Sequence, residues 1–353
     1  MKKTIFIPFF NLGLGGVQTK IIDLANTLAS QNYRVIVYLR DHGAFDKRNL
    51  LSNNVLCIQC PSRWGRIFRR RYNYIFFLLL LWFRPHSFYV SLEELSLFVI
   101  DIIQRIPFYN PTVVLNVDTF VKFDQLTSTL MLRDRFQRAS YVVAPSRDTF
   151  VDLKKRLKLK SPPLVYIPNW TDSKKSTQKN IRQGAVFAGR FASQKRPLLY
   201  LKMMNILRKR FINLRLSMYG EGPMYDQVQF AIQKHQLSSY VSLHKPVMNL
   251  PRVLADKKYL FLFSRYEGLP IIALEAMRSG CIIVSLDTPG TRDAVIDGKT
   301  GICKKTLIQA ANALRVLETN PAKYKTMQRN AYRHVDRIFS THNRDQIVQL
   351  LIA

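Results

Sequence analysis

Two stretches of the chain, about 180 residues apart, repeat one order: apolar run, glycine-bearing turn, helical pattern, second apolar run. In the first, the run Thr4–Phe9 precedes NLGLGGVQ, and the pattern TKIIDLANTLASQ leads to YRVIVYL. In the second, GAVFAGRF is followed by PLLYLKMMNILRKRF and LRLSMYG. Neighbouring parallel strands need a helical crossover of this kind. The sequence therefore predicts an α/β protein with two doubly wound parallel sheets.

The length of 353 residues exceeds what one hydrophobic core usually holds, which also favours two domains. The polar stretch 171–184, TDSKKSTQKNIRQG, is typical of a linker. We therefore predict an N-terminal domain over residues 1–170 and a C-terminal domain over 185–335. A helix over 336–353 is expected to return towards the N-terminal domain. Further strands are predicted at Ser87–Leu92, Thr112–Asn116, Tyr141–Ala144, Leu164–Ile167, Val241–His244, Tyr259–Phe263, Ile282–Ser285 and Gly301–Cys303.

The chain is strongly basic, with 54 Lys and Arg against 23 Asp and Glu and a formal net charge of +31. Such a charge attracts nucleic acid, anionic membrane or phosphorylated ligands, and does not choose among them. Four cysteines in a chain of this length fit a reducing cytoplasm. We interpret Cys57 and Cys60 as packing residues, because no second Cys/His pair has metal-ligand spacing. Pro8 and the glycine-rich turn after it favour a first buried strand over a signal peptide.

The segment from Arg63 to Arg84, RWGRIFRRRYNYIFFLLLLWFR, contains six arginines, eight aromatic residues and no acid. Its uncharged run of nine residues would form about 13 Å of helix, whereas a bilayer core is about 30 Å thick. We predict that the segment lies in a membrane interface. The alternative is a helix whose apolar half packs on the sheet and whose basic half is solvated. The predicted membrane contacts are Arg66, Arg69, Arg70, Arg71, Phe76, Phe77 and Trp82.

Cations follow the first strand of the second half, where Arg190 and Lys195 stand in GRFASQK. A glycine-bearing turn at the carboxyl edge of a parallel sheet exposes backbone N–H groups that bind anions. Arginine adds a bidentate fork and lysine a point charge, which together suit a diphosphate. The next strand ends in YGEGPM and brings a second glycine-rich turn to this edge. The alternative is that both are surface cations of a very basic protein.

Two carboxylates, Glu267 and Glu275, stand in SRYEGLPIIALEAMRSG. Gly268 predicts a tight turn, and Pro270 fits the first position of a helix. Glu267 then lies in a loop at the sheet edge, and Glu275 lies roughly 7 Å further along the helix axis. We predict that the two acids contact different parts of one ligand, a ribose diol and a transferred group. Alternatively, they form ion pairs with arginines such as Arg265 and Arg278.

Together, GRFASQK, YGEGP, SRYEGLPIIALEAMRSGCIIVS and PGTRDAVIDGKTG closely resemble the nucleotide-sugar-binding half of family-4 retaining glycosyltransferases. Two glutamates separated by seven residues are the signature of that family. The resemblance is strong over residues 184–301, moderate over the glycine-rich start, VVAPSRDTF and VYIPNW, and weak over about 41–111. It implies the GT-B fold, with two Rossmann-like domains facing an interdomain cleft. It also implies metal-independent transfer of a hexose from a nucleotide-sugar, a UDP-sugar, without a cofactor.

The resemblance also assigns roles to single residues. Arg190 and Lys195 would hold the donor diphosphate, while Glu275 would bind the ribose hydroxyls. Glu267 would lie near the donor sugar. The remaining donor contacts implied are the backbone of Gly268, Leu269 and Pro270, and Gly15 and Gly16, which would approach the diphosphate across the interdomain cleft.

The chain departs from the family near residue 117, where a histidine is frequent and VVLNVDTF stands here. Asp118 is nearest to that place. It either replaces the histidine by contacting a sugar hydroxyl or caps the next segment. The predicted catalytic residues are Glu267, Arg190, Lys195 and Asp118.

We predict a peripheral glycosyltransferase on the cytoplasmic face of a bacterial inner membrane. Its acceptor would be a lipid-linked oligosaccharide or a lipopolysaccharide glycan, so it would serve surface polysaccharide synthesis. A nicotinamide-dependent dehydrogenase is disfavoured, because Gln18 stands where the GxGxxG fingerprint needs glycine. The charge keeps open a nucleic-acid-binding protein, although no zinc finger or RNP-like stretch is present. A non-catalytic protein that binds sugar nucleotides is the remaining alternative.

Overall fold

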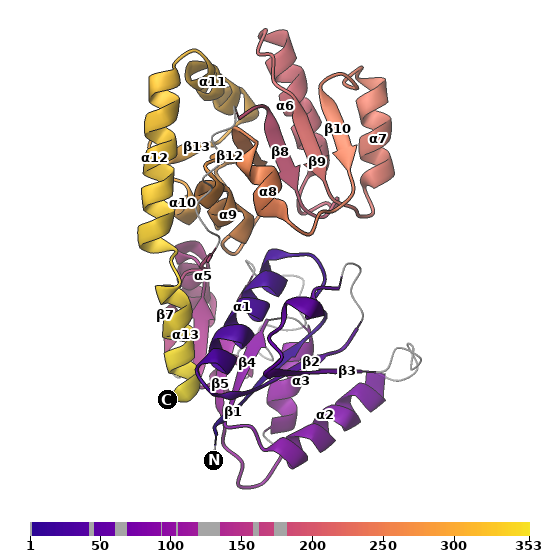
Figure 1. Cartoon of the computed structure of the whole chain (residues 1–353), viewed down its shortest axis with the longest axis vertical. Helices are drawn as coiled ribbons and strands as arrows, with labels where there is room; N and C mark the ends of the chain where they lie inside the picture. The colour runs from indigo at the N-terminus through magenta and orange to yellow at the C-terminus, as the bar shows by residue number, and fades with distance from the viewer. Residues whose placement is uncertain are drawn as a thin grey trace. The chain divides into compact units, whose positions relative to one another are not determined.

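The computed structural model describes residues 2–41, 46–60, 69–92, 94–103, 105–118, 135–157, 162–172 and 182–353. The chain forms two compact units, shown in Figure 1. Unit 1 comprises residues 1–168 and 342–353, and unit 2 comprises residues 169–341. Each unit is a parallel sheet with helices on both faces, which confirms the predicted fold class. Residues 173–181 of the predicted linker lie outside the described residues.

The sheet of unit 1 has seven strands in the order β3-β2-β1-β4-β5-β6-β7, all parallel. Chain order reverses between β1 and β4, which makes this the switch point where doubly wound sheets bind ligands. The predicted strand positions are confirmed to within one residue at each end. The strands are β1 Thr4–Phe9, β2 Arg34–Leu39, β3 Val55–Gln59, β4 Ser87–Ser91, β5 Thr112–Asn116, β6 Tyr141–Ala144 and β7 Leu164–Tyr166.

Helices cover both faces of this sheet. On one face α2, α3 and α5 pack on a core that contains Phe6, Ile36 and Phe88, and α1 and α13 cover the other face. Residues 336–353 do not form one helix, because α12 of unit 2 ends at Ile338 and α13 begins at His342. The helices of unit 1 are α1 Gly16–Ser30, the short 3-10 helix η1 Arg48–Leu50, α2 Arg69–Phe83, α3 Glu94–Ile103, α5 Arg147–Leu157 and α13 His342–Ile352.

Helix α2 corrects one predicted membrane contact. Phe76 is fully buried, and its ring packs edge-on against Phe6 at a centroid distance of 5.5 Å. The prediction that Phe76 contacts a membrane is therefore wrong, because this side of the helix faces the sheet. Phe77 is partly buried against the same core, whereas Trp82 is 82% exposed. Arg66 and the side chains of Arg69, Arg70 and Arg71 lie outside the described part of the chain.

The sheet of unit 2 has six parallel strands in the order β10-β9-β8-β11-β12-β13. Its switch point lies between β8 and β11, the first and fourth strands of the unit. Neighbouring residues of β11 face opposite layers, since Phe261 packs with α6, α7 and α11, and Leu260 with α8, α9 and α12. The strands are β8 Ala185–Ala188, β9 Leu216–Tyr219, β10 Val241–His244, β11 Tyr259–Leu262, β12 Ile282–Leu286 and β13 Gly301–Lys304.

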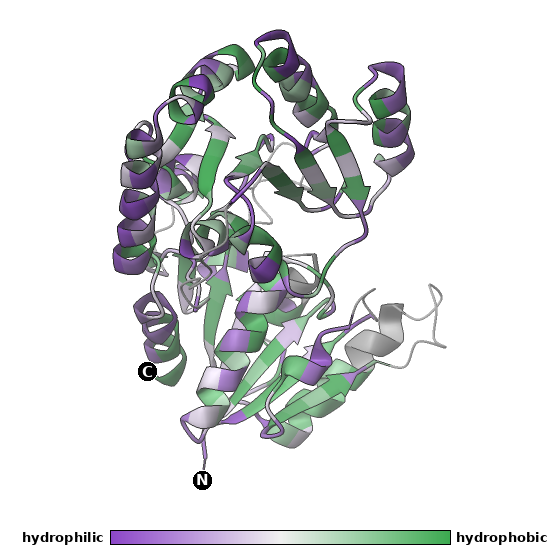
Figure 2. Cartoon of the chain, turned by 45° about the horizontal axis from the view of Figure 1, so that its top comes forward, coloured by the Kyte–Doolittle hydropathy of each residue, from purple (hydrophilic) through white to green (hydrophobic). Residues whose placement is uncertain are grey.

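The helices of unit 2 are amphipathic, with apolar residues towards the sheet. In Figure 2 the strands are mainly green, whereas the long helix α12 is mainly purple. The helices are α6 Pro197–Lys209, α7 Tyr225–Lys234, α8 Leu250–Ala255, α9 Ile271–Ser279, α10 Thr291–Ala294, α11 Leu307–Glu318 and α12 Pro321–Ile338. No helix of the described residues is long and apolar enough to span a bilayer.

Candidate active site

Two glycine-rich turns pair at the carboxyl edge of the unit 2 sheet. The amide of Gly189, after β8, donates to the carbonyl of Tyr219 at 3.0 Å, and the amide of Phe191 donates to Glu221 at 2.8 Å. A Cβ atom on Gly220 would lie only 2.0 Å from the carbonyl oxygen of Gly189. The backbones therefore approach closely because no side chain stands at Gly220.

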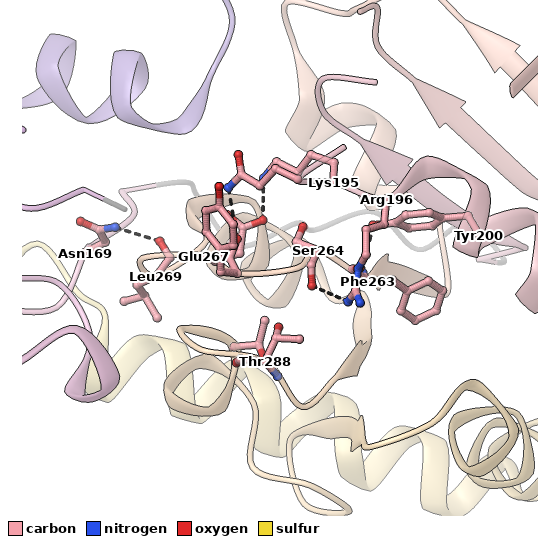
Figure 3. A network of polar contacts seen from close by, with 12 residues as sticks. Asn169, Lys195, Arg196, Tyr200, Phe263, Ser264, Glu267, Leu269 and Thr288 are labelled. Atoms are coloured by element: carbon pink, nitrogen blue, oxygen red, sulfur yellow. Dashed lines mark hydrogen bonds and ion pairs between the residues drawn. The ribbon is translucent and has the colours of Figure 1, made fainter. Parts of the chain in front are cut away.

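An ion pair joins the loops that follow β8 and β11. The Lys195 ammonium lies 2.6 Å from the Glu267 carboxylate, and their side chains are 24% and 9% exposed (Figure 3). The sequence predicted both residues as ligand contacts but did not predict this pairing. Arg278 instead pairs with Asp336, at 3.0 Å. Since β8 and β11 flank the switch point, a cation and a carboxylate meet where an anionic ligand would bind.

Residues beside Lys195 fasten the two loops together. Arg196 donates from Nε to the carbonyl of Phe263 and from Nη2 to that of Ser264, each at 2.6 Å (Figure 3). Its backbone is left-handed, with φ of 48°. Partial burial lowers the pKa of Arg196 from its usual value, although a guanidinium stays charged in proteins. Gln194 donates to the carbonyl of Tyr266 at 3.1 Å, which adds another hydrogen bond between the two loops.

The loop that carries Glu267 is also held by residues that follow β12. The Glu267 amide donates to the carbonyl of Pro289 at 3.0 Å, and the next residue, Gly290, has a left-handed backbone with φ of 82°. A Cβ atom on Gly290 would lie 2.3 Å from the carbonyl oxygen of Glu267 and 2.4 Å from that of Gly268. Asn169, which is buried, donates to the carbonyl of Leu269 at 2.8 Å. With Gln194 and Arg196, three separate segments of the chain therefore hold the backbone of the Glu267 loop.

A buried hydroxyl lies at the start of this loop. Ser264 is fully buried and its Oγ atom has no hydrogen-bond partner among the described residues. The neighbouring Phe263 amide donates to the Tyr200 hydroxyl at 2.9 Å. Burial raises the pKa of Tyr200 well above its ordinary value, so the phenol stays neutral. The end of β11 is thus anchored to α6 by a neutral hydrogen bond as well as by Arg196.

Arg190 and Glu275, two further predicted donor residues, belong to segments that follow strands at the same edge of unit 2. Arg190 is exposed, and no described carboxylate pairs with it. Glu275 is half-buried on α9, which begins at Ile271 with Pro270 as its N-cap, one residue later than predicted. The arrangement presents cations, carboxylates and turn amides together, which suits a ligand with phosphates and hydroxyls. No group of three histidine, cysteine or carboxylate side chains among the described residues is arranged to hold a metal ion.

In unit 1, Asp118 is part of a buried polar cluster. Its carboxylate accepts hydrogen bonds from Lys20 on α1 and from Ser91 at the end of β4. The Lys20 side chain is fully buried, and its ammonium also lies 5.9 Å from the centre of the Tyr89 ring. Asp118 therefore lies near the switch point of unit 1 as one half of an ion pair. Its contact with a sugar hydroxyl stays a prediction.

Gly15 and Gly16, also near this switch point, form the N-cap and first residue of α1. Their approach to a diphosphate stays a prediction.

Sequence reasoning missed the residues that fasten the site. Gln194 and Arg196 flank Lys195, so their place in the turn was available from the sequence. Asn169 and Gly290 act through contacts with residues that are distant along the chain, and no local pattern predicts those contacts. The sequence therefore predicted the charged residues at this edge better than the residues that hold their loops in place.

Two family models match adjacent parts of the chain. The model described as "Glycosyl transferases group 1" matches residues 168–334, and "Glycosyltransferase Family 4" matches residues 14–175. Among curated proteins, a D-inositol 3-phosphate glycosyltransferase of Paenarthrobacter aurescens is 31% identical over 157 residues, 40% of this chain and 38% of that protein. A poly(glycerol-phosphate) alpha-glucosyltransferase of Bacillus subtilis is 29% identical over 119 residues, 33% of this chain and 18% of that protein. The matches thus span less than two fifths of each relative.

Solved structures resemble the whole chain in fold. An S. aureus TarM mutant in complex with fondaparinux, alpha-GlcNAc-glycerol and UDP superposes with a TM-score of 0.83 at 11% identity, covering 100% of both chains. Anabaena Alr3699/HepE in complex with UDP and glucose gives 0.81 at 18% identity, covering 99% of both. The architecture is therefore that of the GT-B glycosyltransferases.

Proposed function

Because the chain belongs to the family-4 glycosyltransferases of the GT-B fold, we propose that it transfers a hexose from a UDP-sugar to a glycan acceptor with retention of anomeric configuration. The observation that carries this proposal is the Lys195–Glu267 pair at the switch point of unit 2, together with the exposed Arg190 in the same turn, which pairs with no carboxylate of the described residues. The relatives HepE and TarM have been crystallised with UDP, which supports a uridine nucleotide as the donor's carrier.

The donor diphosphate would bind at the turn after β8. Arg190 would supply a bidentate guanidinium and Lys195 a point charge, while the glycine-rich turns supply amide donors. The phosphates would compete with Glu267 for the Lys195 ammonium, since these two side chains lie only 2.6 Å apart. Glu267 would then be free to accept a hydrogen bond from a hydroxyl of the donor sugar. Glu275, further along α9, would bind the ribose diol.

The chemistry would depend on stabilising the leaving group. As the bond between the anomeric carbon and the phosphate oxygen breaks, negative charge grows on the diphosphate, where Arg190 and Lys195 lower its energy. The acceptor hydroxyl would form the new bond from the same face, and its proton would pass to the departing phosphate oxygen. Gln194 and Arg196 would keep the two loops in register so that these charges stay fixed. We propose no metal ion in this step.

The acceptor in this proposal is associated with a membrane, as in surface polysaccharide or lipopolysaccharide synthesis. Support comes from the net charge of +31 and from exposed apolar residues of α2, including Trp82. The protein would act as a peripheral enzyme on the cytoplasmic face of the inner membrane. Asp118, held by Lys20 and Ser91, would contact a sugar hydroxyl as a fixed carboxylate.

A nucleotide panel tests the donor proposal. Thermal unfolding is measured with UDP, GDP, ADP and CMP for the wild type and for Glu275→Gln. A ligand at 100 times its dissociation constant adds about 2.7 kcal/mol of stability, which raises the melting temperature by roughly 5–10 °C for a domain of this size. We expect UDP to give this shift in the wild type and a much smaller one in the variant.

Glu318→Gln is the matched control, because Glu318 pairs with Lys258 at the amino end of β11, the edge opposite to the candidate site. It should respond to UDP like the wild type. Equal shifts in both glutamate variants would refute a ribose contact of Glu275. Retention is checked by NMR of the anomeric proton in the product, and metal independence by turnover in the presence of EDTA.

A further inference from the structure

A cavity opens at the amino edge of the unit 1 sheet, where none of the predicted donor or catalytic residues lies. Its volume is about 930 Å³, within the range of ligand pockets. It lies between the end of α2, the turn after α1 and the first residues of β1, β2 and β4. The predicted residues of unit 1 follow β1 and β5 instead, at the carboxyl edge of the same sheet.

The walls of this cavity are cationic. Lys2, Arg34 and Arg84 line it, and the lining contains no acidic residue. None of the three pairs with a carboxylate among the described residues. The Arg34 guanidinium lies 4.7 Å from the centre of the Phe83 ring, which holds it by a cation–π contact. Such a contact leaves the N–H groups at the edge of the guanidinium available to an anion.

His86 adds a neutral donor to the same wall. Its Nδ1 atom accepts a hydrogen bond from the amide of Thr4 at 3.0 Å. In the neutral ring this bond places the proton on Nε2, which can then donate to a ligand. The cavity thus offers charged and neutral donors, which is the set that recognises phosphate oxygens.

An apolar stripe runs along α2 to the mouth of the cavity. Leu78, Leu81 and Trp82 are 46%, 48% and 82% exposed, and their spacing places them on one side of the helix. The opposite side, with Phe76 and Leu80, is buried in the core. Trp82 also lines the cavity. The stripe and the cationic wall are therefore one continuous surface.

A second exposed aromatic side chain lies beside this surface. Phe108 is fully exposed and has a left-handed backbone with φ of 56°. The next residue, Tyr109, donates from its hydroxyl to the carbonyl of Pro85 at 2.5 Å, and the Arg84 guanidinium lies 5.9 Å from its ring. The Phe108 turn is therefore attached to the wall of the cavity.

We propose that this surface binds anionic phospholipids, with lipid phosphates in the cationic cavity and the α2 stripe in the membrane interface. Aliphatic and aromatic side chains beside cations that pair with no described carboxylate fit the boundary between headgroups and acyl chains. Phosphates alone, as in RNA, would match the cations but give no partner to Leu78 and Leu81. The inference deepens the membrane-associated part of the proposed function.

Vesicle co-sedimentation tests this inference with the full chain. We expect the wild type to bind vesicles of phosphatidylcholine mixed with phosphatidylglycerol and to bind pure phosphatidylcholine weakly. The double variant Arg34→Gln/Arg84→Gln should lower the affinity for the anionic vesicles by about tenfold or more, because each cation near a charged surface contributes to binding. Lys202→Gln/Lys234→Gln removes two exposed cations from α6 and α7 and should change the affinity little.

A second set of variants tests the apolar stripe of α2. Trp82→Ser should weaken vesicle binding at high salt, where charge is screened, and Phe230→Ser, which removes an exposed ring of α7, should not. With brominated lipids, quenching of tryptophan fluorescence is measured in a Trp64→Phe background, which leaves Trp82 and the buried Trp170. Trp82→Phe should abolish the quenching.

Three outcomes would overturn the inference. The first is vesicle binding that is equal in the wild type, in Arg34→Gln/Arg84→Gln and in Trp82→Ser. The second is stabilisation by soluble glycerol 3-phosphate without vesicle binding, which would indicate a free phosphate ligand. The third is binding of an RNA homopolymer that depends on Arg34 and Arg84 while vesicles do not bind. Circular dichroism is used to check that each variant is folded. The shift of the melting temperature with UDP, measured separately, distinguishes failure of the lipid proposal from failure of the donor proposal.

Discussion

Replacement of Gly290 by alanine should disturb the Glu267 loop more than a comparable replacement elsewhere. Gly290 and Gly298 both have left-handed backbones, with φ of 82° and 71°. A Cβ atom on Gly290 meets two carbonyl oxygens at 2.3 and 2.4 Å, whereas a Cβ atom on Gly298 meets nothing within 4 Å. The two substitutions therefore share the backbone strain and differ in the steric clash.

The magnitude follows from these two contributions. A left-handed conformation costs an alanine about 1–2 kcal/mol, partly offset by about 0.4–1 kcal/mol from the stiffer unfolded chain. Gly298→Ala should therefore lose about 1 kcal/mol. Gly290→Ala must also move two carbonyls apart, and such overpacking adds about 1–3 kcal/mol. The two melting temperatures should differ by roughly 2–12 °C, since a domain of this size loses about 2–4 °C per kcal/mol.

Thermal unfolding by circular dichroism measures the difference, and UDP titration by calorimetry measures its effect on the candidate site. Gly290→Ala should lower UDP affinity, because the displaced carbonyls belong to Glu267 and Gly268, whereas Gly298→Ala should bind like the wild type. Equal stability and equal UDP affinity in the two variants would refute the close contact between Gly290 and the Glu267 loop.

Three other perturbations test the surrounding contacts. Arg196→Lys keeps the charge, but a lysine cannot donate to both carbonyls at once. The variant should therefore lose about 2 kcal/mol of unfolding free energy and bind UDP more weakly. A loss below a few tenths of a kcal/mol would contradict a stabilising role of the two Arg196 hydrogen bonds. A double-mutant cycle of Lys195→Met and Glu267→Gln should give a coupling of about 1 kcal/mol, at the lower end for contacting residues because Lys195 is partly exposed; additive effects would mean that the pair contributes nothing. Burial lowers the pKa of His334 below its usual 6.5, so the unfolded chain binds its proton more readily and stability should fall as pH drops below 6.5. His334→Gln should flatten this dependence and His235→Gln should not, in urea titrations repeated across pH.

The positions of the strands and of the polar residues at the carboxyl edge of unit 2 could be predicted from the sequence. Short apolar runs such as Thr112–Asn116 are bounded by polar or turn residues. Such runs are typical of parallel strands that are buried on both faces, so few other assignments are possible. Arg190, Lys195 and Glu267 could be placed at the carboxyl edge, where parallel sheets bind ligands, because they follow strands, and Glu275 because it lies in the helix after β11.

Helix α2 shows where such reasoning stops. The sequence placed aromatic rings and arginines on one short segment, and Phe76, Phe77 and Trp82 were all predicted to contact a membrane. Only the position of each residue around the helix axis separates Phe76, which is fully buried, from Trp82, which is 82% exposed. That position depends on which side of the helix packs on the sheet, and a helix apolar on nearly all sides does not specify it.

The sequence by itself determined the two doubly wound sheets and the chemical groups at the carboxyl edge of unit 2, because backbone periodicity and turn residues act over a few neighbouring positions. Tertiary structure alone decided that Lys195 pairs with Glu267, that Gly290 supports the Glu267 loop, and that Arg34 and Arg84 line one cavity. These contacts join residues between 22 and 72 positions apart in the chain. They arise from strand order and packing, which bring distant segments together at one edge of a sheet.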